Sequence, residues 1–231
     1  MYNALELTIS SQVGEGDKQK IVVTNEMVLS IVQKNLALYD KNGEQHYDII
    51  SAFIKSMRGS DPNAAVYWLA RMVEGGEDPK FIARRMVILA SEDIGLANPN
   101  ALLLAQSCFN AINVIGWPES RLILAETAIY LATSPKSNSS CVAIDSAIAK
   151  VRSEGDLPVP LHLRNAPTKL MKNLGYSDGY KYAHNYEGNF VKDNFLPEKI
   201  KGTVFYEPGK NEREEEIRKR ISGMWNDIYN Y

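Results

Sequence analysis

Prolines divide the middle of the chain at nearly even intervals of 17, 20 and 19 residues. The first three of these prolines follow an Asp or an Asn, residue types that cap helix N-termini, and proline is tolerated in the first helical position. Each interval has the length of one helix and a short turn. The spacing therefore predicts an all-α fold, an antiparallel helical bundle. The prolines and their preceding caps are Pro62, Pro79, Pro99, Pro118, Asp61, Asp78 and Asn98.

Hydrophobic periodicity predicts further helices at about 45–58, 138–153 and 211–229. The charged residues of the last helix are spaced for i,i+4 pairs, such as Glu214 with Arg218, and predict a solvated face. The predicted buried residues of the first and last of these helices are Tyr47, Ile50, Phe53, Ile54 and Met57, and Ile217, Ile221, Met224, Trp225 and Ile228.

The segment from about 155 to 206 has little periodicity and is interrupted by Pro and Gly, so a long irregular loop segment is expected near the C-terminus. Its scattered apolar residues, among them Val159, Leu161 and Leu170, predict that it packs against the fold. At the other end of the chain, residues 4–9 resemble the end of a helix with no cap before it. We therefore expect the chain to be a fragment of a longer protein.

Several predicted helices are apolar on more than one side, and two of them have almost no charge. Residues 101–117 contain no charged residue, and residues 122–132 contain only Glu126. A helix that is apolar all round is either central in its bundle or covered by a partner chain. Both alternatives remain open from the sequence, and excess apolar surface favours oligomerisation.

A basic, aromatic stretch covers residues 159–184, although the whole chain has a net charge of −2. No acid lies between Asp156 and Asp178, and the tyrosines are Tyr176, Tyr180 and Tyr182. One interpretation is nucleic-acid contact, in which cations neutralise phosphates and rings stack on bases. The other is a packed loop in which Arg164 bonds carbonyl groups. The candidate contact residues are His162, Arg164, Lys169, Lys172 and Lys181.

No recognised catalytic pattern is present: the chain lacks a Walker-type glycine loop, H-E-x-x-H, C-x-x-C and G-x-S-x-G. Glu92 and Asp93 are adjacent, so they do not share a helix face and are poorly placed as an acid–base pair. Cys108 and Cys141 are expected to be buried free thiols, and His46 a surface residue. The chain alone is therefore not expected to be an enzyme, nor to bind a metal.

No apolar run reaches the ~20 residues of a membrane span, and the N-terminus does not resemble a signal peptide. These features predict no membrane partner and a cytoplasmic location.

Four strings resemble one family closely and in order. They are YDIISAFIKSMRGSDPNAAVYWLARMVEGGEDPKFIARRMVILASEDIGLANP, YLATSPKSNSS, VPLHLRNAPTKLMKNLGY and YKYAH. This sequence resembles the replication-associated recombination protein A family (RarA/MgsA), the bacterial counterpart of the Werner helicase-interacting ATPase. The resemblance covers nearly the whole chain and is weakest in residues 8–35 and after 205.

The resemblance implies that residues 1–58 are the end of an AAA+ lid and that 59–231 are a helical C-terminal oligomerisation domain. Such a domain forms tetramers and is similar to the collar of clamp-loader ATPases. The parent would be a DNA-dependent AAA+ ATPase acting in replication, recombination and repair at stalled forks. Its ATP and Mg sites would lie in a core absent from this sequence. Its partners would be DNA and single-strand DNA-binding protein, and its location the cytoplasm, associated with the nucleoid.

The strings that match the family most closely are residues 59–62, 91–95, 134–137 and 162–169, and the resemblance assigns them to interface or loop architecture and to DNA contact. Within them and beside them, the candidate interface or loop residues are Asp61, Trp68, Arg84, Arg85, Glu92, Asp93 and Lys136.

Overall fold

The computed structural model describes residue 24 and residues 44–231. Every regular element in this part of the chain is a helix, which confirms the predicted all-α class. Most of the predicted lid segment, 1–58, lies outside the described residues. The chain forms two compact units, each built from two segments. Unit 1 comprises the residues up to Leu89 together with Leu103–Thr133, and unit 2 comprises Ala90–Leu102 together with Ser134–Tyr231. Among the described helices, none combines the length and hydropathy needed to cross a membrane.

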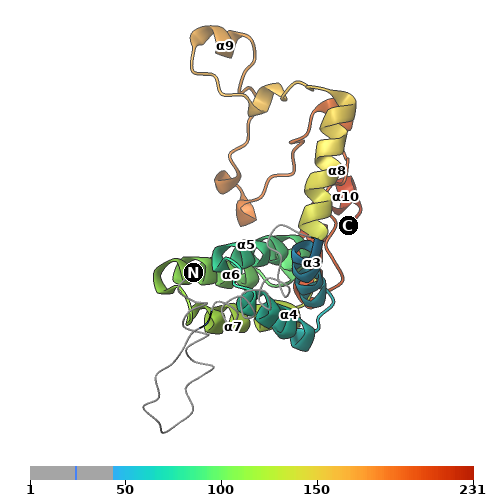
Figure 1. Ribbon diagram of the computed structural model, residues 1–231. Coiled ribbons are helices and arrows are strands. Elements are labelled where there is room, and N and C mark those ends of the chain that lie inside the picture. The colour runs from blue at the N-terminus through green and yellow to red at the C-terminus, as the bar shows by residue number, and fades with distance from the viewer. Residues whose placement is uncertain (1–23, 25–43) are drawn as a thin grey trace. The chain divides into compact units, whose positions relative to one another are not determined.

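Unit 1 is a helical bundle. It contains α3 (Glu44–Arg58), α4 (Pro62–Glu74), α5 (Pro79–Leu89), α7 (Ser120–Thr133) and most of α6 (Asn100–Ile115), as Figure 1 shows. Helix α7 contacts α3, α4 and α5, so it is a central helix of this bundle. This position accounts for much of its apolar sequence. The largest fully buried side chains of the unit include Phe53, Met57, Met72, Ile82, Met86, Leu124 and Leu131.

The first two proline intervals begin helices as predicted. The Asp61 carboxylate accepts the Ala64 N–H at 3.0 Å, and the Asp78 carboxylate accepts the Lys80 N–H at 2.9 Å. Helices α6 and α7 instead begin one and two residues after Pro99 and Pro118, at Asn100 and Ser120. The buried face of α3 also differs from the prediction, because Tyr47 is 68% exposed whereas Ile49 is buried.

Unit 2 contains α8 (Ser139–Glu154), α9 (Lys169–Asn173) and α10 (Glu212–Tyr229), with the π-helical turn η1 (Ala90–Ile94) and the 3-10 turn η2 (Gly95–Ala97). Turn η2 contacts both α8 and α10. Between α8 and α10 the chain is largely irregular, as predicted. Apart from α9, this stretch forms the short 3-10 turns η3 (Leu161–Leu163), η4 (Ala183–Asn185), η5 (Glu187–Asn189) and η6 (Glu198–Ile200).

The packing of unit 2 departs from the prediction in two respects. The irregular segment leaves several of its apolar residues open, since Val159, Leu161 and Leu170 are 53%, 48% and 68% exposed, although Val191 is buried. The fully buried side chain of α10 is a carboxylate, Glu214, whereas the predicted apolar stripe of this helix is only half-buried. The buried Glu214 carboxylate, and not only apolar packing, therefore holds α10 in unit 2.

Candidate functional site

The basic stretch contains a closed loop around α9, residues 161–177, which we call the α9 loop. The Ser177 N–H donates to the Leu161 carbonyl at 3.0 Å and joins the two ends of the loop. The Ser177 hydroxyl also donates to the Arg164 carbonyl at 2.7 Å. Gly175 and Ser177 have φ values of +77° and +63°, the left-handed backbone that lets the chain reverse. The loop is thus built as a compact surface loop whose ends are held together.

The Arg164 side chain stabilises the closed loop through contacts within the segment. Its Nε donates to the Val159 carbonyl at 2.7 Å, and its Nη1 donates to the Tyr176 hydroxyl at 3.1 Å. The guanidinium carbon lies 5.1 Å from the centre of the Tyr176 ring, within cation–π range. The side chain of Arg164 is therefore engaged within the loop.

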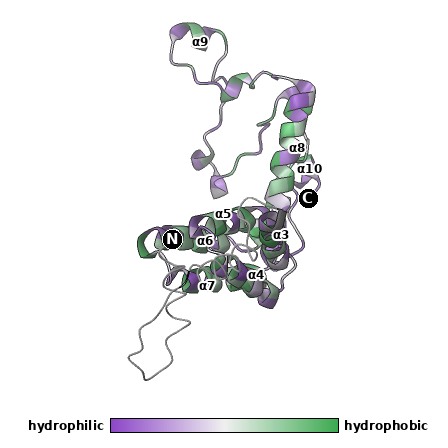
Figure 2. Ribbon diagram, in the orientation of Figure 1, coloured by the Kyte–Doolittle hydropathy of each residue, from purple (hydrophilic) through white to green (hydrophobic). Residues whose placement is uncertain are grey.

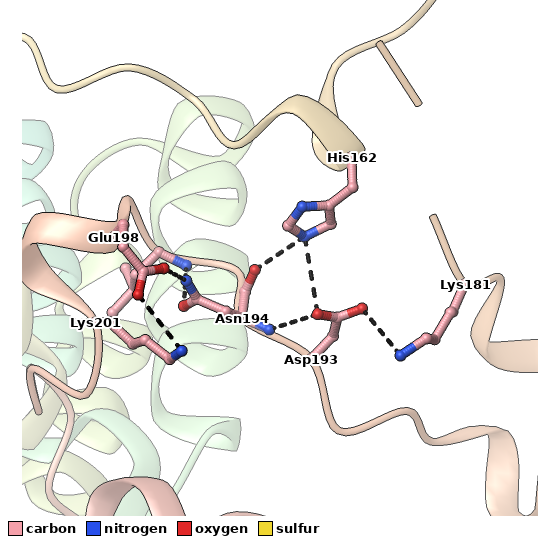
Figure 3. Close-up of polar contacts among 7 residues, drawn as sticks. His162, Lys181, Asp193, Asn194, Glu198 and Lys201 are labelled. Carbon is pink, nitrogen blue, oxygen red and sulfur yellow. Dashed lines mark hydrogen bonds and ion pairs between the residues drawn. The ribbon is translucent and has the colours of Figure 1, made fainter. Parts of the chain in front are cut away.

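His162 and Lys181 converge on one acid, as Figure 3 shows. His162 Nε2 lies 3.0 Å from the Asn194 carbonyl oxygen and 4.0 Å from Asp193 Oδ1. Lys181 Nζ lies 3.7 Å from Asp193 Oδ2. In the same view, Lys201 Nζ lies 3.6 Å from Glu198 Oε1. These contacts tie the start of the α9 loop to residues 193–194, far along the sequence.

Lys169 and Lys172 differ from the other three candidate residues. Both are exposed on α9, and neither has a carboxylate partner among the residues that the structure describes. They are three positions apart, so they lie on one face of the helix turn. The neighbouring Leu170 and Leu174 are 68% and 58% exposed. The outer part of the α9 loop thus combines free cations with open apolar surface.

A second cluster in unit 2 joins two of the family-like strings, 91–95 and 134–137. The Ser137 N–H donates to the Asp93 carbonyl at 2.8 Å. Gly95 has a φ of +47°, and a Cβ there would lie 3.1 Å from the Ser137 carbonyl oxygen, so this approach favours glycine. Lys136 Nζ donates to the Ser134 carbonyl at 2.6 Å, and burial lowers the pKa of Lys136 while the nearby Asp93 opposes that shift.

Glu214 of α10 completes this cluster, although the sequence predicted it on a solvated face. It is fully buried. Its carboxylate accepts hydrogen bonds from the Ser139 hydroxyl, the Gly209 N–H at 3.0 Å and the Asn211 amide at 2.5 Å. Burial alone would raise the pKa of Glu214, but hydrogen bonds from Ser137, Ser139, Gly209 and Asn211 outweigh burial and lower the pKa to about 2. Glu214 is therefore a buried anion that fastens α10 to residues 137–139.

The sequence also gave no indication of a buried contact between a histidine and a carboxylate in unit 1. His46, expected at the surface, is buried, and its Nδ1 lies 2.9 Å from Glu77 Oε2. Its ring centre is 5.2 Å from that of Phe81. Glu77 comes directly after the Gly75-Gly76 pair that ends α4, so only the tertiary fold brings it to the start of α3.

The remaining candidate residues have separate local roles. Asp61 caps α4, and Trp68 lines a cleft of about 400 Å³ together with Arg71, whose guanidinium lies 5.7 Å from the centre of a Trp68 ring. Arg84 is exposed and lies 6.0 Å from the centre of the Phe81 ring. Arg85 is half-buried and Glu92 is exposed.

The described residues contain no group of three or more His, Cys, Asp and Glu that could hold a metal ion. Cys108 is buried and free, as predicted, whereas the other free thiol, Cys141, is only half-buried.

Comparison with known proteins finds two family models on this chain. The MgsA AAA+ ATPase C-terminal model matches residues 59–225, and the AAA C-terminal domain model matches residues 1–58. Helix α3, from the second match, packs against α4, α5 and α7 from the first.

Several relatives carry the name replication-associated recombination protein A. The Bacillus subtilis protein is 42% identical over 95% of this chain and 52% of its own length, and the Coxiella burnetii protein is 41% identical over 95% and 50%. The Escherichia coli K12 protein is 38% identical over 96% of this chain and 50% of its own length. The chain thus spans about half the length of these curated relatives. Since one family model matches well over half of the residues, the chain belongs to the MgsA AAA+ ATPase C-terminal family.

Proposed function

We propose that the chain is the assembly domain of an AAA+ ATPase that acts in DNA replication and recombination at stalled forks, and that it forms a homotetramer. The names of the relatives support the role in replication and recombination, and the exposed apolar surface of a single chain supports the homotetramer. In this proposal the ATP and Mg sites belong to an ATPase core of the parent protein. The parent's partners are DNA and single-strand DNA-binding protein, and it is cytoplasmic and nucleoid-associated.

The observation that carries the proposal is the exposed face of α6, which has no charge. No Asp, Glu, Lys or Arg occurs from Ile94 to Pro118. Along α6, the side chains of Ala101, Ala105, Cys108 and Ile112 form the buried stripe. The opposite face exposes Leu103 by 66% and Val114 by 88%, with uncharged polar residues between them. A solvent-facing helix surface normally carries charge, so this face has the composition of a surface that a partner covers.

Helix α8 of unit 2 offers a second apolar surface. Ile144, Ile148 and Val151 have helical spacing and are 56%, 40% and 61% exposed. Figure 2 shows hydrophobic bands along α8. A closed tetramer of dihedral symmetry requires at least two different self-complementary interfaces. The α6 face and this α8 stripe are candidates for the two.

The test is to place charge on the α6 face. We expect Leu103→Glu with Val114→Glu to convert the tetramer into a smaller species, because four buried carboxylates at a symmetric dimer contact would repel one another without partners. Sedimentation velocity gives the mass, and circular dichroism confirms that the helices remain.

Val204→Glu is the matched control, since Val204 is 42% exposed but lies outside both surfaces. This variant should keep the tetramer. A wild-type mass in the α6 double variant would remove the α6 face from the proposal.

A further inference from the structure

The outer part of the α9 loop is a concentrated positive surface. Between Asp156 and Asp178 the sequence has Arg164, Lys169 and Lys172 and no acid. The Arg164 side chain contributes to closing the loop, because it donates to the Val159 carbonyl and lies over the Tyr176 ring. Lys169 and Lys172 are the cations that remain open to solvent in this loop, and neither has a carboxylate within the described residues. Their charge is available to an anionic ligand.

Exposed aromatic rings follow directly where the loop closes. Tyr180 and Tyr182 are each 53% exposed, and the Tyr180 N–H donates to the Ser177 carbonyl at 3.2 Å, which holds it beside the loop ends. Lys181, between them, pairs with Asp193 at 3.7 Å. The ring of Tyr182 contacts the ring of His184, with the two centres 5.1 Å apart, but both tyrosines keep about half of their surface open to solvent.

We propose that the α9 loop and Tyr180–Tyr182 bind single-stranded nucleic acid. Lys169 and Lys172 contact phosphates, and Tyr180 and Tyr182 stack on unpaired bases. The inference rests on the proposed role in DNA metabolism, but it does not depend on the tetramer. It assigns the contact to particular side chains. Of the five candidate residues considered from the sequence, Lys169 and Lys172 face the ligand, and the other three make contacts within the segment.

Single strands fit these residues better than the other polyanions. Lysines neutralise phosphates of any nucleic acid, but aromatic rings stack only on bases whose faces are free, which a duplex hides except at its ends. An acidic peptide would use the lysines together with Leu170 and Leu174 and would gain little from the two rings. The presence of both features favours an unpaired strand.

Arg164 is a positioning residue in this site. Its hydrogen bonds to Val159 and Tyr176 fix the loop that presents α9. Arg164→Ala should weaken binding by opening the loop, and hydrogen exchange at the Ser177 N–H should accelerate in this variant. Lys169→Ala should weaken binding without changing that exchange rate.

The experiment titrates the full chain against a fluorescein-labelled 20-nucleotide oligo(dT) and follows fluorescence anisotropy at several salt concentrations. Lys169→Ala with Lys172→Ala should weaken binding by about 10- to 100-fold at low salt. The slope of log affinity against log salt should become shallower by about 1.4, since each lost phosphate contact on a single strand removes about 0.7.

The matched control is Lys199→Ala with Lys201→Ala, which removes the same charge. Lys199 Nζ lies 2.5 Å from Glu154 and Lys201 Nζ lies 3.6 Å from Glu198, so both lysines are already paired. This control should change affinity by less than about threefold and the salt slope by less than one contact, about 0.7. Equal losses in the two double variants would show a general charge effect and overturn the assignment.

Substitutions of the two tyrosines distinguish binding of a single strand from binding of a duplex. Tyr180→Ala with Tyr182→Ala should weaken oligo(dT) binding at least tenfold, whereas the paired Phe substitutions should retain it, because stacking needs the ring and not the hydroxyl. The proposal is overturned if the Ala variants bind normally, or if a 20-base-pair duplex binds more tightly than oligo(dT). Lysine-dependent binding of an Asp/Leu peptide without oligo(dT) binding also overturns it.

The mass of each variant separates this inference from the assembly proposal. Loss of oligo(dT) binding with an unchanged tetramer concerns the α9 loop alone. A monomeric wild-type chain that still binds through Lys169 and Lys172 would defeat the tetramer and leave this site in place.

Discussion

At the scale of single residues, burial and hydrogen bonds act in opposite directions on the pKa of the buried Glu214 carboxylate. The unperturbed pKa of 4.5 falls to about 2, although burial opposes the change, because several donors converge on one carboxylate. A group whose pKa is lower in the folded chain stabilises the fold above its unfolded pKa. That stabilisation is lost as the pH falls from about 4.5 towards about 2.

Glu214→Gln should therefore lower the free energy of unfolding of unit 2 by on the order of 3 kcal/mol at pH 7, from about 2.5 pH units at 1.36 kcal/mol each. The difference from wild type should shrink between pH 4.5 and pH 2. Urea unfolding followed by circular dichroism measures both.

Glu216→Gln is the control, because Glu216 is exposed on the same helix. It should change stability by less than about 0.5 kcal/mol. If Glu214→Gln and wild type unfold alike at pH 7, Glu214 does not fasten α10 in this way.

At the scale of elements, local signals located the helices well. Asp61 before Pro62 and Asp78 before Pro79 predicted the starts of α4 and α5, since a cap is a contact between residues a few positions apart. The faces were harder to predict. Tyr47 was predicted to be buried on α3 but is exposed, and Glu214 was predicted to be solvated on α10 but is buried. Partners distant in the sequence decide which side of a helix is covered.

Partners distant in the sequence also determine the candidate sites. A basic stretch was visible in the sequence, but its division into Arg164, which closes the loop, and Lys169 and Lys172, which remain open, depends on the backbone reversal at Ser177. The pairing of His46 with Glu77 depends on how α3 meets the turn after α4. Neither arrangement leaves a periodic signal in the sequence.

Helix α3 provides the test at this scale, because it belongs to the core of unit 1 although its residues match a different family model from those of α4. Phe53 has no exposed surface. Phe53→Ala should lower the free energy of unfolding by about 3 to 5 kcal/mol, from lost burial and the cavity left behind.

Tyr47→Ala, on the same helix at 68% exposure, should cost less than about 1 kcal/mol. Chemical denaturation curves compare the two. Similar small losses in both variants would mean that α3 is not part of the core.

At the scale of the whole molecule, each unit has a buried interior, and each also exposes an apolar helix surface. Glu214 is buried among its hydrogen-bond partners in unit 2, whereas Phe53 and Met57 are buried in unit 1, where α7 is the central helix. The charge-free face of α6 and the stripe on α8 remain open in a single copy. The central claim is that further copies of this chain cover those surfaces.

Sedimentation equilibrium of the unmodified chain tests that claim most directly. One chain has a mass of 25.9 kDa, so four have about 104 kDa. At micromolar concentration and moderate salt we predict the tetramer mass, falling only on dilution. A mass of 25.9 kDa across the whole concentration range would contradict the claim.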